Sequence, residues 1–143
     1  MSEIASFETE VVFRRVAAGG DVEEDPGWAL LRDAVEAVAR ERQGHVTGEV
    51  RDYFGRVYVC DLALTVPGLP GGLGLEVSRE DGRLRFLYDP YKGAGLAEEV
   101  QAEILQNFSA LAVGRALADL HYEVELEEGR PGGRRVIVVR GTR

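Results

Sequence analysis

The hydrophobic pattern of the last third of the chain predicts a long helix followed by a two-stranded hairpin. Between residues 95 and 120, apolar side chains recur every three or four positions, as on one face of a helix: Leu96, Val100, Ile104, Phe108 and Leu111. Apolar and acidic residues then alternate over residues 122–127, and a glycine-rich turn leads to the valine-rich run 136–139. We expect this helix and hairpin to bury their apolar faces against each other and against further sheet.

The same periodicities divide the rest of the chain into one helix and five strands. Alternation predicts strands over about residues 5–14, 45–54, 57–66, 73–77 and 84–88. Asp25 and Pro26 form a helix start, and apolar spacing continues the helix to about residue 43. The order β-α-β-β-β-β-α-β-β predicts a single α+β domain over residues 1–143, a largely antiparallel sheet with two helices packed on one face.

Composition narrows the classes of partner. The 143 residues include 25 acidic and 17 basic side chains, a formal charge of −8, which disfavours a nucleic-acid partner. The single cysteine, Cys60, excludes an internal disulfide, and no apolar run reaches the roughly 20 residues of a membrane span. The first residues also lack the features of a signal peptide. We therefore expect a cytoplasmic protein that does not enter a membrane.

No residue pattern indicates catalysis, a cofactor or a metal. His45, Cys60 and His121 stand far apart, without the paired spacing of zinc ligands. Cys60 falls in an apolar strand, where free cysteine acts as a small hydrophobic residue. The glycine-rich segment 67–74 lacks the lysine of a phosphate-binding loop and leads into a strand. We predict no catalytic residue, no metal ligand and no cofactor.

Two short segments are candidate contact surfaces. The first combines two tyrosines, a carboxylate and a lysine between a strand and a helix: Tyr88, Asp89, Tyr91 and Lys92. The second is the turn over residues 51–56, which holds Arg51 and Tyr53. Tyrosine is enriched at recognition surfaces, although a loop that covers the edge of the core is the simpler interpretation of both segments.

Several stretches from about residue 51 onward match one family in order. They are Tyr53-Phe54-Gly55, residues 60–64, Gly74-Leu75-Glu76-Val77, residues 84–89, residues 104–110, residues 121–125 and residues 136–140. In these stretches the chain resembles a family of bacterial and algal-plastid proteins catalogued as domain of unknown function 1257. It departs from that family at Ser6-Phe7, Phe108-Ser109 and His121. The family has no established activity, but its members are often encoded beside AAA-type ATPases, which implies an accessory or adaptor role.

Three hypotheses follow. The first is a non-enzymatic protein-binding or accessory module, with an AAA-type ATPase as candidate partner and the two tyrosine-bearing segments as its contact surface. The second is a small-ligand-binding or enzymatic domain with a cleft near residues 88–92, where Asp89 and His121 supply polar groups. The third is a structural homo-oligomer, in which the valine-rich last strand pairs with its copy in a second chain.

Overall fold

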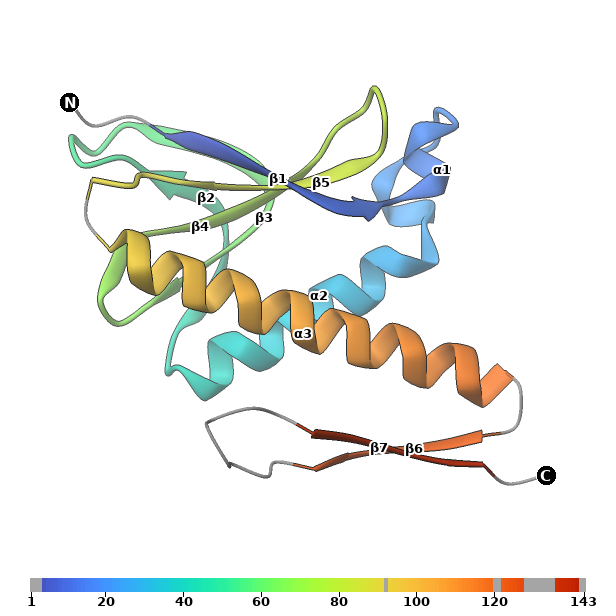
Figure 1. Ribbon diagram of the computed structural model, residues 1–143. Helices are drawn as coiled ribbons and strands as arrows, with labels where there is room; N and C mark the ends of the chain where they lie inside the picture. The colour runs from blue at the N-terminus through green and yellow to red at the C-terminus, as the bar shows by residue number, and fades with distance from the viewer. Residues whose placement is uncertain (1–3, 92, 120–121, 128–135, 142–143) are drawn as a thin grey trace.

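A five-stranded antiparallel sheet forms the centre of the molecule. The computed structural model describes residues 4–91, 93–119, 122–127 and 136–141. The sheet consists of β1 (Ala5–Val12), β2 (His45–Arg51), β3 (Val57–Val66), β4 (Leu69–Val77) and β5 (Arg83–Tyr88). Its strand order is β1-β5-β4-β3-β2, and each neighbouring pair is antiparallel (Figure 1). The predicted α+β fold is confirmed.

Two long helices, α2 (Pro26–Glu41) and α3 (Ala94–Asp119), cover one face of this sheet (Figure 1). A short helix, α1 (Arg14–Ala17), and a 3₁₀ turn, η1 (Val22–Glu24), connect β1 to α2. The predicted helix start is correct, because the Asp25 carboxylate accepts a hydrogen bond from the Gly27 amide at 2.9 Å and Pro26 follows directly. The Arg15 amide donates to the other oxygen of Asp25 at 3.1 Å, so this one side chain joins α1 to α2.

The core lies between the helices and the inner face of the sheet. Its sheet side is built by alternate residues of the central strands, all at most 5% exposed: Leu62, Leu64, Val66, Leu73, Leu75, Val77, Leu84 and Phe86. The helices contribute the spaced apolar residues that the sequence indicated, among them Leu31, Val35, Val100 and Ile104, which are fully buried. Burying one such side chain contributes about 1.5–3 kcal/mol, so this apolar layer is the main source of stability.

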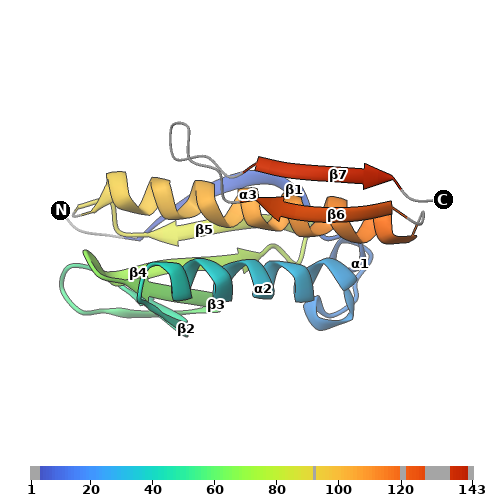
Figure 2. The ribbon, with the colours of Figure 1, turned by 90° about the horizontal axis from the view of Figure 1, so that it is seen from below.

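The C-terminal hairpin stands apart from the five-stranded sheet. Strands β6 (Tyr122–Glu127) and β7 (Val136–Gly141) pair with each other as a separate two-stranded sheet, and β6 contacts α3. Figures 1 and 2 both show the hairpin beside the C-terminal half of α3. The hairpin therefore lies against the helix, and its strands do not extend the larger sheet. The hairpin side chains whose burial the sequence predicts lie outside the side chains that the structure describes. Among the described residues, no helix is both long and apolar enough to cross a membrane.

The β2–β3 hairpin curls over the outer face of the sheet, the face that the helices leave uncovered. The register between the two strands shifts between Thr47 and Glu49, and such a bulge bends a strand and increases its twist. Val50, 1% exposed, consequently lies against β4, where a side chain at Gly74 would meet its Cγ1 at 3.0 Å and the Cys60 Sγ at 2.8 Å. The bulge turns Cys60 to the outer face, although strict alternation along the strand would place it on the inner face with Leu62.

Glycines in β4 make this crossing possible. A Cβ atom at Gly71 would lie only 2.5 Å from the Arg51 carbonyl oxygen, so no larger residue fits without a shift of the hairpin. The sequence pattern predicts that residues 67–72 connect the strand 57–66 to the strand 73–77 without belonging to either. Only Pro67 and Gly68 form the turn, with Gly68 at a φ of +90°, and β4 already begins at Leu69. The remaining glycines belong to the strand because the hairpin lies directly on them.

Replacing Gly71 with alanine should therefore destabilise the protein. The Gly71→Ala methyl group would collide with the Arg51 carbonyl, and we expect the free energy of unfolding to fall by about 1–3 kcal/mol in urea titrations. Gly48→Ala in β2 is the matched control, because nothing lies within 4 Å of its added Cβ. Its effect should stay within about 0.5 kcal/mol. Equal losses in the two variants would contradict the close crossing.

Candidate functional site

The turn between β2 and β3 is held in one conformation by Asp52. Its carboxylate, 5% exposed, accepts hydrogen bonds from the amides of Phe54 and Arg56, each at 2.9 Å, and from the Arg56 guanidinium. The Gly55 amide donates to the Asp52 carbonyl at 3.0 Å, and Gly55 has a φ of +82°. This is a three-residue hairpin loop with glycine in the left-handed position. Tyr53 and Phe54 occupy the centre of the turn, and their rings project from it.

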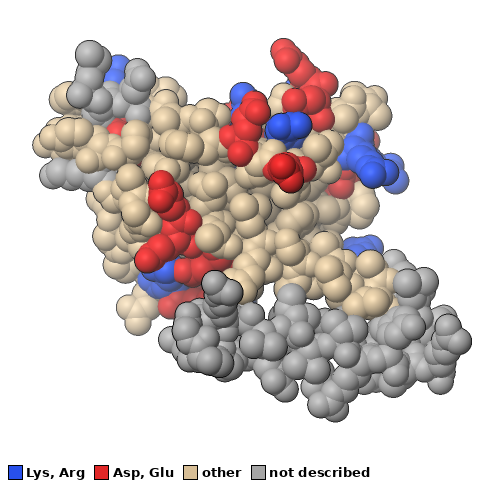
Figure 3. Space-filling model, viewed as in Figure 1, with Lys and Arg blue, Asp and Glu red and all other residues tan. Residues whose placement is uncertain are grey.

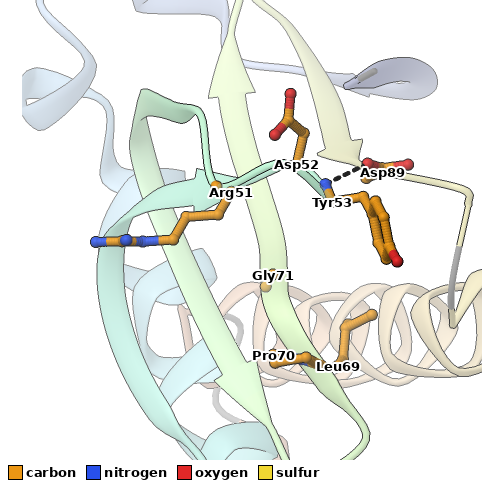
Figure 4. Close-up of a pocket in the computed structure, with 9 residues that line it drawn as sticks. Arg51, Asp52, Tyr53, Leu69, Pro70, Gly71 and Asp89 are labelled. Carbon is orange, nitrogen blue, oxygen red and sulfur yellow. Dashed lines mark hydrogen bonds between the residues drawn. The ribbon is translucent and has the colours of Figure 1, made fainter. Parts of the chain in front are cut away.

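Asp89 fastens this turn to the end of β5. One oxygen of its carboxylate accepts from the Tyr53 amide at 2.8 Å, and the other accepts from the Tyr91 amide at 2.9 Å. Figure 4 shows the first of these bonds crossing from the turn to Asp89. The rings of Tyr53 and Tyr91 then meet with centroids 4.6 Å apart, and Phe54 contacts Tyr53 edge-on at 5.5 Å. We call Tyr53, Phe54 and Tyr91 the aromatic tip.

The structure thus brings together three of the six predicted binding residues, Tyr53, Asp89 and Tyr91. Arg51 lies beside them in sequence, but its side chain points away from Asp89 (Figure 4) and pairs with Glu49 at 3.2 Å. Lys92 lies outside the described residues, as does His121.

Tyr88 is a core residue. It is 2% exposed and stacks on Phe7 with ring centroids 4.5 Å apart. Burial, together with the Glu98 carboxylate, raises the pKa of its phenol. Its position in the row of Leu84 and Phe86 explains this, because alternate residues of a strand share a face. Tyr88 therefore does not belong to the contact surface that we predicted.

Exposed apolar side chains are concentrated on the β2–β3 hairpin and in the loop after β5. Nine large hydrophobic residues are exposed in the part of the chain whose side chains are described, and six of them are the tip residues and their neighbours on β3: Tyr53, Phe54, Val57, Tyr58, Val59 and Tyr91. Phe54 is 67% exposed and Val59 is 82% exposed. Phe54 belongs to the turn over residues 51–56 that the sequence indicated, but sequence reasoning missed Val57 and Val59, because alternation alone does not show which face of an outer hairpin is covered. Apolar groups concentrated in one place mark interaction sites more often than scattered ones do.

A hollow of about 360 Å³ lies between the aromatic tip and the start of β4. Tyr53 and Asp89 line one side of it, and Leu69, Pro70 and Gly71 line the other (Figure 4). Burial alone would raise the pKa of Asp52, but hydrogen bonds from Arg56 and Phe54 outweigh it and hold that pKa below its usual value. The Asp52 carboxylate is therefore ionised at neutral pH, and it serves as a hydrogen-bond acceptor rather than as a general acid.

Beyond the aromatic tip, the charged side chains of the outer sheet face are arranged in pairs. Asp61 bonds Arg79 at 2.7 Å, and Glu76 lies 3.5 Å from Arg85. On the side of the molecule seen in Figure 3, some of the basic side chains likewise lie next to acidic ones. Within the described residues, no three His, Cys, Asp or Glu side chains come together as they would around a metal ion.

Comparisons with protein-family models, with curated proteins and with solved structures give no match to this chain. The resemblance to domain of unknown function 1257 therefore stays a prediction.

Cys60 should behave as an unreactive thiol. Burial raises its pKa from the ordinary 9.0 to about 11, and the carboxylates of Glu76, Asp61 and Glu49 act in the same direction. Only the thiolate reacts with iodoacetamide, so at pH 8 alkylation should be about a hundredfold slower than that of a free cysteine with a pKa of 9.0. The rate should rise with pH up to about 11. A rate that levels off near pH 9 would show an unperturbed thiol.

Proposed function

We propose that this chain is a cytoplasmic, non-enzymatic protein-binding module that contacts its partner through the aromatic tip. The observation that carries the proposal is that Tyr53, Phe54 and Tyr91 are exposed while the backbone beneath them is fixed. Aromatic side chains supply large contact area at low cost in conformational entropy, and they are enriched in protein interfaces.

The fixed backbone supports this proposal in a second way. Asp52 satisfies two amides of the turn, and Asp89 ties the turn to the loop that carries Tyr91. A partner would therefore meet rings that are already positioned, and less ordering would oppose binding. A loop that only covered the core would turn its rings inward, as Tyr88 does, whereas Tyr53 and Tyr91 are each 53% exposed.

An AAA-type ATPase is the partner to test first. The support is the resemblance to a family whose members are encoded beside such ATPases, which is an association and not a mechanism. The geometry of the aromatic tip fits a protein surface with an apolar pocket, and it carries no feature specific to an ATPase.

Site-specific photo-crosslinking tests the proposal. With p-benzoylphenylalanine in place of Phe54, irradiation of cells should give a defined adduct with one protein, identified by mass spectrometry. The same replacement at Glu36, which is exposed on α2, is the control and should give no such adduct. Tyr91→Ala in the position-54 chain should reduce the adduct several-fold, because the two rings form one surface.

Adducts that are equally diffuse at positions 54 and 36 would contradict a binding role for the aromatic tip. Crosslinking in vitro with a purified AAA-type ATPase tests separately whether the partner is an ATPase. A defined adduct with a different protein would keep the binding module and remove the ATPase.

Small-ligand binding is the second candidate function, and the hollow beside Asp89 is the observation that favours it. Its volume of about 360 Å³ falls within the size range of small-molecule sites.

A thermal-shift screen of small metabolites tests this second candidate. A ligand at a hundred times its Kd stabilises the folded state by about 2.7 kcal/mol, which should give a melting shift of several degrees. The shift should disappear in Tyr53→Ala, which removes one wall of the hollow, and persist in Val113→Ala on α3. A shift that is unchanged in Tyr53→Ala would place the ligand elsewhere.

A further inference from the structure

The outer face of the β2–β3 hairpin carries an ordered set of four side chains. The strand register pairs Glu49 with Val59 and Arg51 with Val57, and cross-strand partners share a face. The Arg51–Glu49 ion pair at 3.2 Å confirms that both charges project on the same side. Between them in sequence, Val50 points inward and is 1% exposed. We call Glu49, Arg51, Val57 and Val59 the outer patch.

The valines of the outer patch are uncovered. Val57 is 46% exposed and Val59 is 82% exposed, the highest value among the exposed large hydrophobic residues of the described part. The charges beside them also reach solvent, since the side chains of Arg51 and Glu49 are 56% and 43% exposed. The two valines lie side by side on β3 and the two charges lie opposite them on β2, so an apolar row borders a charged row. Interfaces likewise combine apolar groups with polar groups at their border.

We propose that a second copy of this chain docks on the outer patch in a two-fold symmetric dimer. In such a dimer each residue meets a counterpart under rotation, so a patch must be complementary to itself. Rotation about an axis between the two cross-strand pairs places Glu49 opposite Arg51 of the other copy, and Val57 opposite Val59. Both ion pairs and the valine contacts form at once. This inference goes beyond the proposed function, because it concerns the face of the hairpin and not the aromatic tip.

Charge favours a second copy over an unrelated occupant. Each chain has a formal charge of −8, so two copies repel each other, and they repel least where they meet on a face whose local charge is balanced. The outer patch carries one positive and one negative charge, hence no net charge. An acidic or basic partner would gain nothing from that balance, whereas a copy rotated by two-fold symmetry matches both charges.

Charge-swap variants test the dimer by sedimentation velocity from about 1 to 300 µM. The wild type should approach twice the 15.7 kDa mass of one chain as concentration rises. In Glu49→Arg alone, the new arginine at position 49 of each copy would face Arg51 of the other copy. In Arg51→Glu alone, Glu49 of each copy would face the new glutamate at position 51 of the other copy. Each single variant should dimerise about tenfold more weakly or worse. An equimolar mixture of the two should regain the dimer, since every arginine then faces a glutamate.

Val59→Asp gives a second, independent variant and should remain monomeric. Val12→Asp on β1, 44% exposed, is its matched control and should dimerise as the wild type does. Melting curves establish that each variant is folded. A wild type that stays at 15.7 kDa throughout would overturn the proposal. So would folded single variants that keep the dimer, or a mixture that fails to restore it. A photo-crosslink from position 59 to another protein would assign the outer patch to that protein instead.

Discussion

The close crossing of the β2–β3 hairpin over β4 is the constraint on which the distinctive features of this fold depend. The Arg51 carbonyl passes so near Gly71 that a Cβ atom would approach it to 2.5 Å. Because the hairpin lies this close to β4, Val50 is buried and the turn reaches Asp89. A hairpin that continued the plane of the sheet would leave Asp89 without the Tyr53 amide, and the aromatic rings of two distant segments would not meet.

Aspartate carboxylates fix the backbone of several turns and loops in this acidic chain. Asp25, Asp52 and Asp89 each accept hydrogen bonds from backbone amides. They do so at a helix start, in a hairpin turn and between two loops, respectively. A carboxylate that accepts several hydrogen bonds is stabilised in its ionised form, and the lowered pKa of Asp52 shows this effect. The pKa of a general acid must instead be raised. The same groups that build the candidate site thus make it better suited to binding than to proton transfer.

The elements with strong periodicity were predictable from sequence, and those set by distant contacts were not. The bounds of β3 were predicted as the structure has them, and Asp25 and Pro26 correctly marked the start of α2. The predicted start of β4 at residue 73 was wrong, because the strand begins at Leu69. Glycine usually ends a strand, whereas here it lies within the strand and allows the hairpin to cross closely, which only the fold reveals. Tyr88 could have been placed in the core, since it continues the alternation of Leu84 and Phe86. The partnership of Asp89 with Tyr53 spans 36 residues, and no local pattern encodes it.

The β2–β3 hairpin carries the whole outer patch and two of the three residues of the aromatic tip, Tyr53 and Phe54, which has consequences for how the two surfaces would act together. The Asp89 carboxylate accepts a hydrogen bond from the Tyr53 amide in the turn. Arg51, two residues before Tyr53, lies directly on Gly71, so the turn and the strand that leads into it are both fixed in position. A shift of the hairpin would therefore move the aromatic tip and the outer patch together. If partner binding and self-association each favour the same hairpin position, each would strengthen the other by an equal factor, as thermodynamic linkage requires. The affinity of the tip for a partner would then depend on the concentration of the chain itself, a dependence that two surfaces on independent elements would lack.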